Sequence, residues 1–243
     1  CSVVRRLDGF NRHVSEALDL KSDLMIDNAS NITVGIENVD VFLPNKNKDI
    51  LIKDCTIDLM KYQSLLIMGA SGVGKSTLLR TLAGLWPYAK GNVYLPKEEE
   101  FLFLPQRPYL PLGSLRQAIS YPVVEEVISE KYSDEEIKEI LIACKLENLA
   151  DKLNIVDDWS RILSLGEQQR IAFVRILLYR PEFVFLDEAT SALDEDLEGN
   201  LYDMLKIHLP NTKIISIAHR SSLIAKHQAI LRLKEKGCWE IHE

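Results

Sequence analysis

The chain has 243 residues, of which 47% are hydrophobic and 27% are charged, so its composition predicts a folded core and excludes a disordered chain. The net charge of −7 disfavours a nucleic-acid-binding surface, and we expect no nucleic-acid partner. No apolar run approaches the ~18 residues of a membrane span, and the four scattered cysteines form no cluster typical of a metal site.

Residues 1–31 are predicted to form an amphipathic helix followed by a linker. Apolar residues first recur at alternating steps of four and three, the spacing of a narrow helix seam. They are Val3, Leu7, Phe10, Val14 and Leu18. The pattern fits a helix packed on its own domain as well as the tail of a longer upstream element. Residues 20–31 are rich in Asp, Asn and Ser, which favours a linker.

From residue 32 to about residue 62, apolar and polar residues alternate, which predicts a small antiparallel sheet. Residues 91–95 are expected to return to this sheet. Between these two segments, the continuous apolar run over residues 65–68 predicts a buried strand.

The segment after that strand matches the phosphate-binding pattern G-x-x-x-x-G-K-[ST]. Its residues are Gly69, Ala70, Ser71, Gly72, Val73, Gly74, Lys75, Ser76 and Thr77. A helix is expected to follow over residues 76–83, so that loop N–H groups and the positive helix end converge on an anion. Lys75 can reach the β- and γ-phosphates, and the Ser76 hydroxyl can ligate Mg²⁺. This context predicts a nucleoside triphosphate site rather than a glycine-rich turn that binds nothing.

The remaining elements predict an α/β fold with a helical insertion over about residues 112–180. Capping boxes at Ser133 and Ser164 indicate the beginnings of two helices in the insertion. Continuous apolar runs indicate buried parallel strands. These strands are residues 101–104, 183–186 and 213–217, with a crossover helix around 197–207 and a terminal hairpin of 230–233 with 238–241.

An apolar strand ends in two carboxylates, Asp187 and Glu188. In parallel sheets, ligands bind at the carboxyl ends of the strands. Asp187 can therefore hold the magnesium shell, and Glu188 can polarise the water that attacks the γ-phosphate. Alone, the two residues would be interpreted as a solvated acidic pair. Together with the glycine loop, they predict triphosphate hydrolysis.

Four further segments resemble, in order, the motifs of ABC-type ATPases. Gln106 resembles the Q-loop glutamine, and residues 163–170, with the sequence L-S-L-G-E-Q-Q-R, resemble the signature segment. Residues 191–194 resemble the D-loop, and residues 217–220 resemble the segment of the switch histidine. The chain is therefore similar to an ABC transporter ATP-binding domain over about residues 32–243.

The resemblance implies a P-loop NTPase core with a mainly parallel sheet, an N-terminal antiparallel β subdomain and a helical signature subdomain. It implies ATP and Mg²⁺ as cofactors. The metal site would comprise Ser76, Gln106 and Asp187. Two copies would form a head-to-tail dimer, in which each copy gives part of its signature to the ATP of its partner. The residues given would be Ser164, Gly166 and Gln168.

Catalytic roles also follow from the resemblance. Glu188 would be the base and Lys75 would hold the phosphates. His219 would hydrogen-bond the γ-phosphate and the attacking water, although by itself it would be interpreted as a core histidine at a strand end. Gln106 would report magnesium and phosphate occupancy to the helical insertion, and Asp194 would lie at the dimer seam.

Two departures from the family pattern concern the signature and the adenine contact. Leu165 stands where the family usually has glycine, and its side chain could crowd the phosphate or point away. Leu43 stands where an aromatic residue commonly stacks on adenine. Neighbouring strand residues face opposite ways, so Phe42 is not assumed to substitute for it.

Three stretches are most similar to exporter-type domains of one branch, which contains peroxisomal fatty-acyl half-transporters and bacterial transporters of cobalamin or antimicrobial peptides. They are residues 84–87, 104–116 and 157–161. In that branch a membrane domain precedes the ATPase domain, which would explain the start at Cys1 rather than Met. Trp159 would then face the membrane domain, or pack within the helical insertion.

The expected function is ATP hydrolysis that drives transmembrane transport. We expect the domain at the cytosolic face of a membrane, with the bacterial inner membrane favoured over the peroxisomal one. The alternatives are a soluble ABC ATPase of DNA repair or translation and a silent nucleotide-binding regulator. No insertion, tandem domain or basic face of the soluble class is visible in the sequence, and the complete set of catalytic residues disfavours the silent one.

Overall fold

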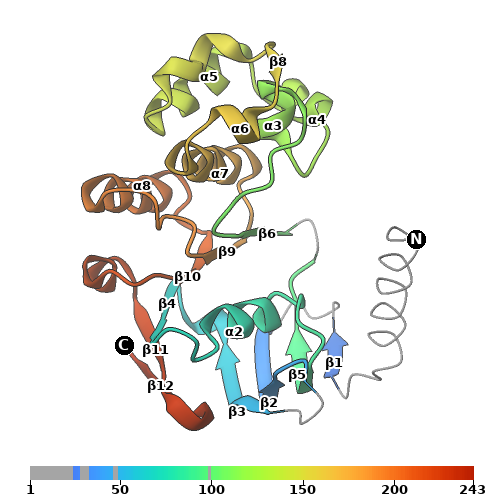
Figure 1. The fold of residues 1–243 in the computed structure, drawn as a ribbon, viewed down its shortest axis with the longest axis vertical. Coiled ribbons are helices and arrows are strands. Elements are labelled where there is room, and N and C mark those ends of the chain that lie inside the picture. The colour runs from blue at the N-terminus through green and yellow to red at the C-terminus, as the bar shows by residue number, and fades with distance from the viewer. Residues whose placement is uncertain (1–23, 28–32, 46–48, 98–99) are drawn as a thin grey trace, which may run out of the picture.

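The structure is a computed structural model that describes residues 24–27, 33–45, 49–97 and 100–243. Two sheets and a group of helices make up most of the fold (Figure 1). The helical subdomain lies at one end of the molecule, the smaller sheet lies at the other end, and the larger sheet lies between them. The helix predicted over residues 3–18 lies outside the described residues.

The larger sheet has six strands in the order β12-β11-β4-β10-β9-β6. Its neighbouring strands run parallel, except that the edge strand β12 is antiparallel to β11. The strands are β4 (Ser64–Gly69), β6 (Phe101–Leu104), β9 (Phe183–Asp187), β10 (Lys213–Ile217), β11 (Ala229–Leu233) and β12 (Trp239–His242). The apolar runs and the terminal hairpin were therefore predicted correctly.

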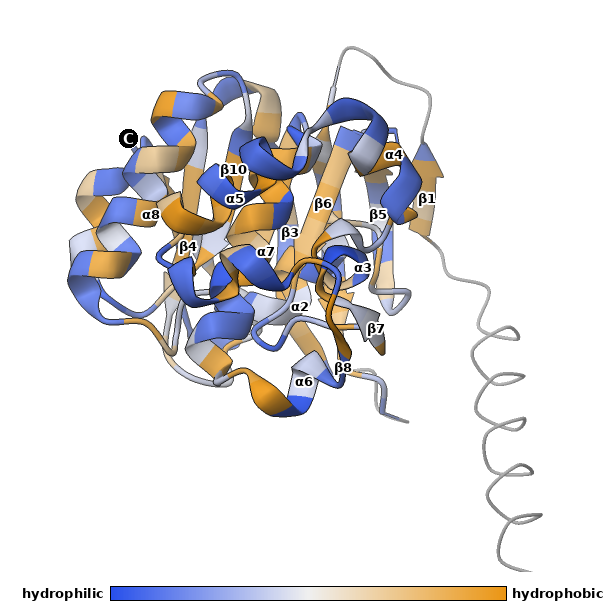
Figure 2. Ribbon diagram, turned by 90° about the horizontal axis from the view of Figure 1, so that it is seen from above, coloured by the Kyte–Doolittle hydropathy of each residue, from blue (hydrophilic) through white to orange (hydrophobic). Residues whose placement is uncertain are grey.

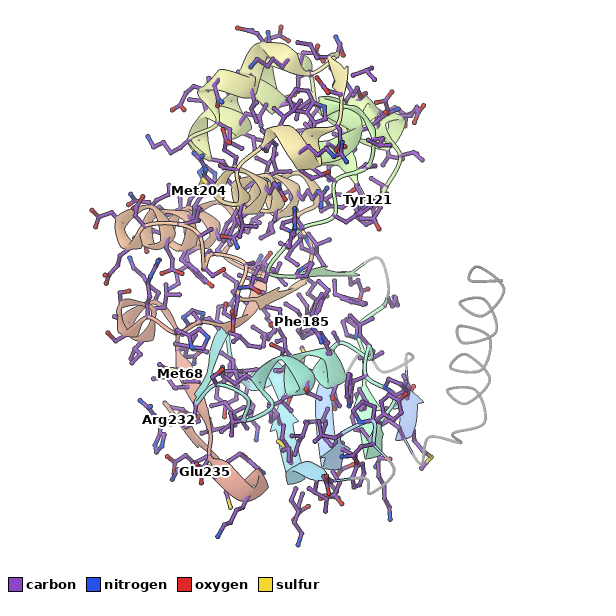
Figure 3. All side chains as sticks on the ribbon, in the orientation of Figure 1. Met68, Tyr121, Phe185, Met204, Arg232 and Glu235 are labelled. Carbon is purple, nitrogen blue, oxygen red and sulfur yellow. The ribbon has the colours of Figure 1, made fainter. Side chains whose placement is uncertain are left out.

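Both faces of this sheet are buried at its central strands β4, β9 and β10, which explains their continuous apolar runs. Leu66 and Val184 pack into the core of the helical subdomain, whereas Ile67 and Phe185 pack into the core shared with the smaller sheet. Successive residues of a strand point to opposite faces, so a strand that is covered on both faces needs apolar residues throughout. Phe185 is labelled in Figure 3, where it lies between β9 and helix α2.

The smaller sheet has the strand order β1-β5-β2-β3. Its strands are β1 (Leu24–Asp27), β2 (Gly35–Phe42), β3 (Ile50–Asp58) and β5 (Ala89–Tyr94). The strand β2 pairs antiparallel with β3 and β5, as predicted.

The linker predicted over residues 20–31 is wrong for Leu24–Asp27, which form β1 and pair parallel with β5. The Asp, Asn and Ser residues around this segment favoured a linker, but its backbone groups are hydrogen-bonded to β5 as an edge strand of four residues. Leu24 is buried whereas Met25 to Asp27 are exposed, so only the first residue of this edge strand packs into the core.

Helix α2 (Lys75–Leu82) is packed between the two sheets. Its core residues Leu78, Leu79 and Leu82 are fully buried among strands of both sheets. The helix ends at Ala83, and Gly84 follows with a φ of +70°, a left-handed conformation that favours glycine. This confirms the predicted helix end.

The helical subdomain lies between β6 and β9 in the chain. Its helices are α3 (Leu115–Ser120), α4 (Glu125–Lys131), α5 (Asp134–Ala143), α6 (Trp159–Ile162) and α7 (Leu165–Tyr179). The predicted capping boxes at Ser133 and Ser164 are both present. In Figure 2, α5 and α7 alternate hydrophilic and hydrophobic stretches, whereas β6 is hydrophobic along its length.

The subdomain also contains a ribbon of two-residue strands, β7 (Gly113–Ser114) and β8 (Val156–Asp157), which the sequence did not predict. Trp159 is 3% exposed, and its Nε1 donates a hydrogen bond to the carbonyl of Gly113 at 3.2 Å. The expectation that Trp159 faces a membrane domain is therefore wrong, because its ring packs within the subdomain.

Helix α8 (Glu195–His208) forms the crossover from β9 to β10, as predicted. Asp194 is its N-cap, and the Asp194 carboxylate accepts a hydrogen bond from the N–H of Leu197 at 2.8 Å. Short 3-10 helices complete the connections: η1 (Leu59–Lys61), η3 (Glu147–Lys152), η4 (Ser221–Lys226) and η5 (Glu235–Gly237). Within the described part of the chain, no helix combines the length and apolar character of a membrane span.

Candidate nucleotide site

The glycine loop joins β4 to α2, and two of its positions, Gly69 and Gly74, favour glycine. A Cβ at Gly69 would lie 2.6 Å from the carbonyl oxygen of Leu233. Gly74 has a φ of 104° and is the N-cap of α2. Among the described residues, no side chain caps the first turn of α2. Its N–H groups are therefore available to an anion held at the loop.

Lys75 is folded back onto this loop. Its side chain is buried, and Nζ donates hydrogen bonds to the carbonyls of Gly69 at 3.0 Å and Ala70 at 2.9 Å. Burial lowers the pKa of the Lys75 ammonium from its ordinary value, while the nearby carboxylates of Glu188 and Asp187 oppose that change. The cation is thus already at the loop where phosphates are expected.

Asp187 ends β9 beside the first turn of α2. The hydroxyl of Ser76 donates to Asp187 Oδ1 at 2.7 Å, and Arg80 contacts Oδ2 at 3.1 Å. Asp187 is 4% exposed, so its carboxylate is held between two residues of α2. A hydroxyl and a carboxylate are the hard oxygen donors that Mg²⁺ prefers, so these two predicted metal-site residues fit that ion.

Glu188 follows directly, and the structure brings three predicted catalytic residues together around it. His219 Nε2 lies 2.8 Å from Glu188 Oε1, and Gln106 Nε2 donates to Oε2 at 3.2 Å. The His219 side chain is 53% exposed, so it is not the core histidine of the alternative interpretation. Glu188 itself has a φ of 53°, in the left-handed region that non-glycine residues seldom adopt. Gln106 contacts the carboxylate of Glu188 rather than that of Asp187.

The signature segment lies at the beginning of α7. The Ser164 hydroxyl accepts a hydrogen bond from the N–H of Glu167, and the Glu167 carboxylate in turn accepts from the N–H of Ser164 at 2.9 Å. Leu165, the departure from the family pattern, is 39% exposed. A Cβ at Gly166 would lie 3.3 Å from the carbonyl oxygen of Ala192, so this residue permits close approach to the D-loop of its own chain.

Gln168 lies differently from its neighbours in the signature. It is 2% exposed, and its Nε2 donates to the carbonyls of Ser160 and Leu163, each at 2.9 Å. The side chain therefore points into its own subdomain rather than toward a ligand outside it. Among the described residues, no hydrogen bond or ion pair joins residues 164–168 to the glycine loop.

Gln169 was not singled out from the sequence, although it is fully buried at the site. Its Nε2 donates to the carbonyl of Gln106 at 2.8 Å, and its Oε1 accepts from the N–H of Ala192 at 2.9 Å. Gly166 and Gln169 are three residues apart and share one face of α7, but the sequence alone does not indicate that this face lies toward the D-loop.

A pocket of about 270 Å³ adjoins the glycine loop. Its lining residues are Ile50, Leu51, Ala70, Ser71, Gly72, Val73, Lys234, Glu235, Lys236 and Gly237. Glu235 is labelled at the terminal hairpin in Figure 3. Leu43, the residue expected near adenine, is 38% exposed just past the end of β2, and its N–H donates to the carbonyl of Asp49. The β2–β3 hairpin therefore brings exposed apolar side chains to this side of the molecule.

A strand, a glycine loop, a helix and an acidic strand end, arranged on a parallel sheet, define a P-loop nucleotide-binding protein. The family profile described as ABC transporter matches residues 52–191, more than half of the chain. The chain belongs to the ABC transporter ATP-binding family, as the signature, Q-loop and D-loop segments predicted.

Relatives from bacteria and eukaryotes carry transporter names. The chain is 49% identical over 191 residues to an uncharacterized ABC transporter ATP-binding protein of Haemophilus influenzae, covering 79% of this chain and 31% of that protein. It is 39% identical over 216 residues to the human lysosomal cobalamin transporter ABCD4, covering 85% and 35%. It is 33% identical over 259 residues to the ABC transporter D family member 1 of Arabidopsis thaliana, covering 98% and 19%. The chain thus spans about a third or less of these relatives.

Proposed function

We propose that this chain binds ATP with Mg²⁺ and hydrolyses it to ADP and phosphate, and that the reaction drives transport across a membrane. One observation carries the proposal. The Ser76–Asp187 pair and the Glu188–His219–Gln106 cluster lie side by side at the carboxyl edge of the larger sheet, next to the glycine loop. Together they provide a place for the phosphates, the metal and the attacking water.

The loop N–H groups and Lys75 would hold the β- and γ-phosphates. Ser76 and Asp187 would hold Mg²⁺, which when bound supplies charge neutralisation for the phosphates. Glu188 would accept a proton from the water as the water oxygen attacks the γ-phosphorus. The bond between the γ-phosphorus and the β–γ bridging oxygen then breaks, and ADP leaves. His219, now hydrogen-bonded to Glu188, would orient the water and the γ-phosphate.

The pocket beside the loop is proposed to hold the nucleoside end of ATP. It adjoins Ala70–Val73 on one side and the exposed apolar residue Ile50 on the other. Leu43 lies across the same hairpin from Ile50, because Phe42 pairs with Ile50 at the end of the two strands. The base would then rest on aliphatic side chains instead of an aromatic ring.

A second copy of the chain is proposed to complete the site. Ser164 and Gly166 lie at the beginning of α7, where the N–H groups not used by the capping box and the positive helix end suit a phosphate of the partner's ATP. Gln168 is proposed to support this segment from within, through its hydrogen bonds to Ser160 and Leu163. The D-loop with Asp194 would lie at the seam between copies.

The rest of the transporter is proposed to be a membrane domain on the same polypeptide. The surface around the Q-loop and the β7–β8 ribbon exposes large apolar side chains, as a contact surface would. They are Tyr109 (61% exposed), Leu112 (76%), Val156 (73%) and Ile162 (53%). Transporter names among longer relatives support the same proposal over a role in DNA repair.

The position at the cytosolic face of a membrane follows from that proposal. Identity is higher to the bacterial relatives, at 49% and 41%, than to the D-family relatives of Arabidopsis thaliana and humans, at 33% and 39%. This difference favours a bacterial inner membrane over a peroxisomal one.

Reading the gene upstream of Cys1 tests the membrane domain. We expect roughly six apolar segments of about 20 residues each on the same open reading frame. An upstream sequence without such segments, or a stop codon followed by a start codon close to Cys1, would contradict an attached membrane domain while leaving the ATPase proposal intact.

Replacing Lys75 with alanine tests the nucleotide site. The variant removes the cation that contacts the loop carbonyls, and we expect MgATP affinity to fall by at least about 100-fold because a charge-assisted phosphate contact is lost. Titration with a fluorescent ATP analogue measures this. Lys213→Ala is the control, because the Lys213 ammonium also donates to two backbone carbonyls, those of Met60 and Tyr62. These two residues precede β4, whereas the glycine loop follows it. Equal affinity in the Lys75 variant and the parent would refute the site.

A further inference from the structure

Gln169 lies on the inner face of α7, one turn after Gly166, and is fully buried between the signature helix and the catalytic loops. Its side chain uses both ends of its amide. This distinguishes it from the adjacent Gln168, whose amide contacts only carbonyls next to its own helix.

The amide nitrogen of Gln169 reaches two loops. It donates to the carbonyl of Gln106 at 2.8 Å and to the hydroxyl of Ser191 at 3.2 Å, and it lies 3.5 Å from the carbonyl oxygen of Glu188. The amide oxygen accepts from the N–H of Ala192 at 2.9 Å. One buried residue thus connects the backbone of the Q-loop and the D-loop to the helix that begins at Ser164.

A second contact closes this network. The Gln106 side chain donates both to the hydroxyl of Ser191 at 3.3 Å and to the carboxylate of Glu188 at 3.2 Å. Ser191 is therefore shared by Gln106 and Gln169. A movement of Gln106 toward a bound phosphate or metal would change the hydrogen bonds of Ser191 and the carbonyl that Gln169 holds.

We infer that Gln169 is a positioning residue that makes the Q-loop, the D-loop and the beginning of α7 move as one unit. This inference rests on the proposed ATPase function. Through this unit, nucleotide bound at the site of one chain sets the position of the signature that the same chain presents to its partner. Gln169 is fully buried and both ends of its amide are occupied by Gln106, Ser191 and Ala192, so its assigned role is to position these loops rather than to contact ATP.

The buried amide favours such a role over simple packing. An apolar side chain of similar length would fill the same space, but it would leave the Gln106 carbonyl and the Ala192 N–H without their partner. Hydrogen bonds to two different loops fix their relative positions, which packing of an aliphatic side chain specifies less strictly.

The test compares Gln169→Met in the full chain with the parent. We expect kcat to fall by about 10- to 100-fold, as for a displacement of catalytic groups of the order of 1 Å, with KM for ATP changed by less than about threefold. Gln63→Met is the control, because Gln63 Nε2 also donates to two carbonyls, those of Pro210 and Thr212. Gln63 immediately precedes β4, whereas the glycine loop follows that strand. It should retain the parental kcat.

Hydrogen exchange of the same variants in a Glu188→Gln background separates positioning from folding. In that background, ATP should protect residues 104–108, 164–169 and 191–193. With methionine at position 169, protection should remain over 104–108 and be lost over the other two segments. Unchanged kcat, or ATP-induced protection that still reaches all three segments, would overturn the inference.

If Gln169→Met fails to fold, Ser191→Ala takes its place, because Ser191 is exposed and the shared hydroxyl is removed without a change in the helix. Full kcat and full protection in Ser191→Ala would then overturn the inference. If ATP protects no segment in the unsubstituted chain and no turnover is measured there, the proposed function fails, which is a different result from an unaffected Gln169 variant.

Discussion

Glu188→Gln is expected to stop ATP turnover while ATP remains bound. The substitution removes the carboxylate proposed to accept the proton of the attacking water, and general-base catalysis contributes about 10²- to 10⁴-fold. Lys75, Ser76 and Asp187 remain, so the contacts to phosphate and metal are unaffected. The glutamine amide can still contact His219 and Gln106. We therefore expect a decrease in kcat of at least about 100-fold with nearly unchanged ATP affinity.

The same variant should trap a dimer if two copies close over ATP. Light scattering after gel filtration, with and without MgATP, measures this, and phosphate release measures the turnover. Glu182→Gln is the matched control, since Glu182 immediately precedes β9 whereas Glu188 immediately follows it. It should turn over ATP as the parent does. Unchanged steady-state hydrolysis by Glu188→Gln would eliminate Glu188 as the base. A Glu188→Gln protein that binds MgATP but stays monomeric would contradict closure by dimerisation.

Ser164→Arg is expected to damage the partner's site rather than the site of the substituted chain. The long cationic side chain would stand at the positive end of α7, where the proposed phosphate of the partner's ATP would lie. Loss of the cap would also cost about 1 kcal/mol. The homodimer should therefore lose nearly all turnover, whereas MgATP binding to the glycine loop of each chain should persist.

Mixing two inactive variants distinguishes the two arrangements. A dimer of one Ser164→Arg chain and one Lys75→Ala chain has one complete site, because the intact loop of the first chain meets the intact signature of the second. Half of the dimers in an equal mixture are mixed and each has one of two sites, so activity should return to about a quarter of the parental value. No recovery would mean that the signature serves its own chain.

Ser133→Arg provides the control for folding. Ser133 begins α5 with the same reciprocal capping box, in which Glu136 takes the role of Glu167. Its replacement should therefore cost similar stability without loss of turnover. Thermal unfolding of both variants checks that their stabilities match. A Ser133 variant as inactive as the Ser164 variant would attribute the loss to the helix rather than to the signature.

The fold was predictable where one short segment carries the whole signal. The apolar runs of β4, β9 and β10 and the pattern of the glycine loop are of this kind, because a strand covered on both faces is mostly apolar. The edge strand β1 and the β7–β8 ribbon could not be predicted, since strands of two to four residues are stabilised by pairing with distant segments and leave little periodicity.

The site was predictable by residue type but less so by side-chain direction. His219, Gln106 and Glu188 lie together as their motifs implied. Gln168 and Gln169 are identical in type and adjacent in sequence, yet one donates to the carbonyls of Ser160 and Leu163 and the other reaches the Q-loop and the D-loop. A rotation of about 100° per helical residue separates their directions, and only the contacts of α7 with its neighbours decide which of them faces the site.

The left-handed backbone at Glu188 has a consequence for how this protein tolerates change. A non-glycine residue in that region costs about 1 kcal/mol or more, and the strand pairing of Asp187 and the hydrogen bond from the Glu188 N–H to the carbonyl of Ile217 hold it there. The chain is thus less stable than it could be at the residue where chemistry is proposed to occur. Selection for thermal robustness alone would favour glycine at this position, and would remove the carboxylate along with the strain.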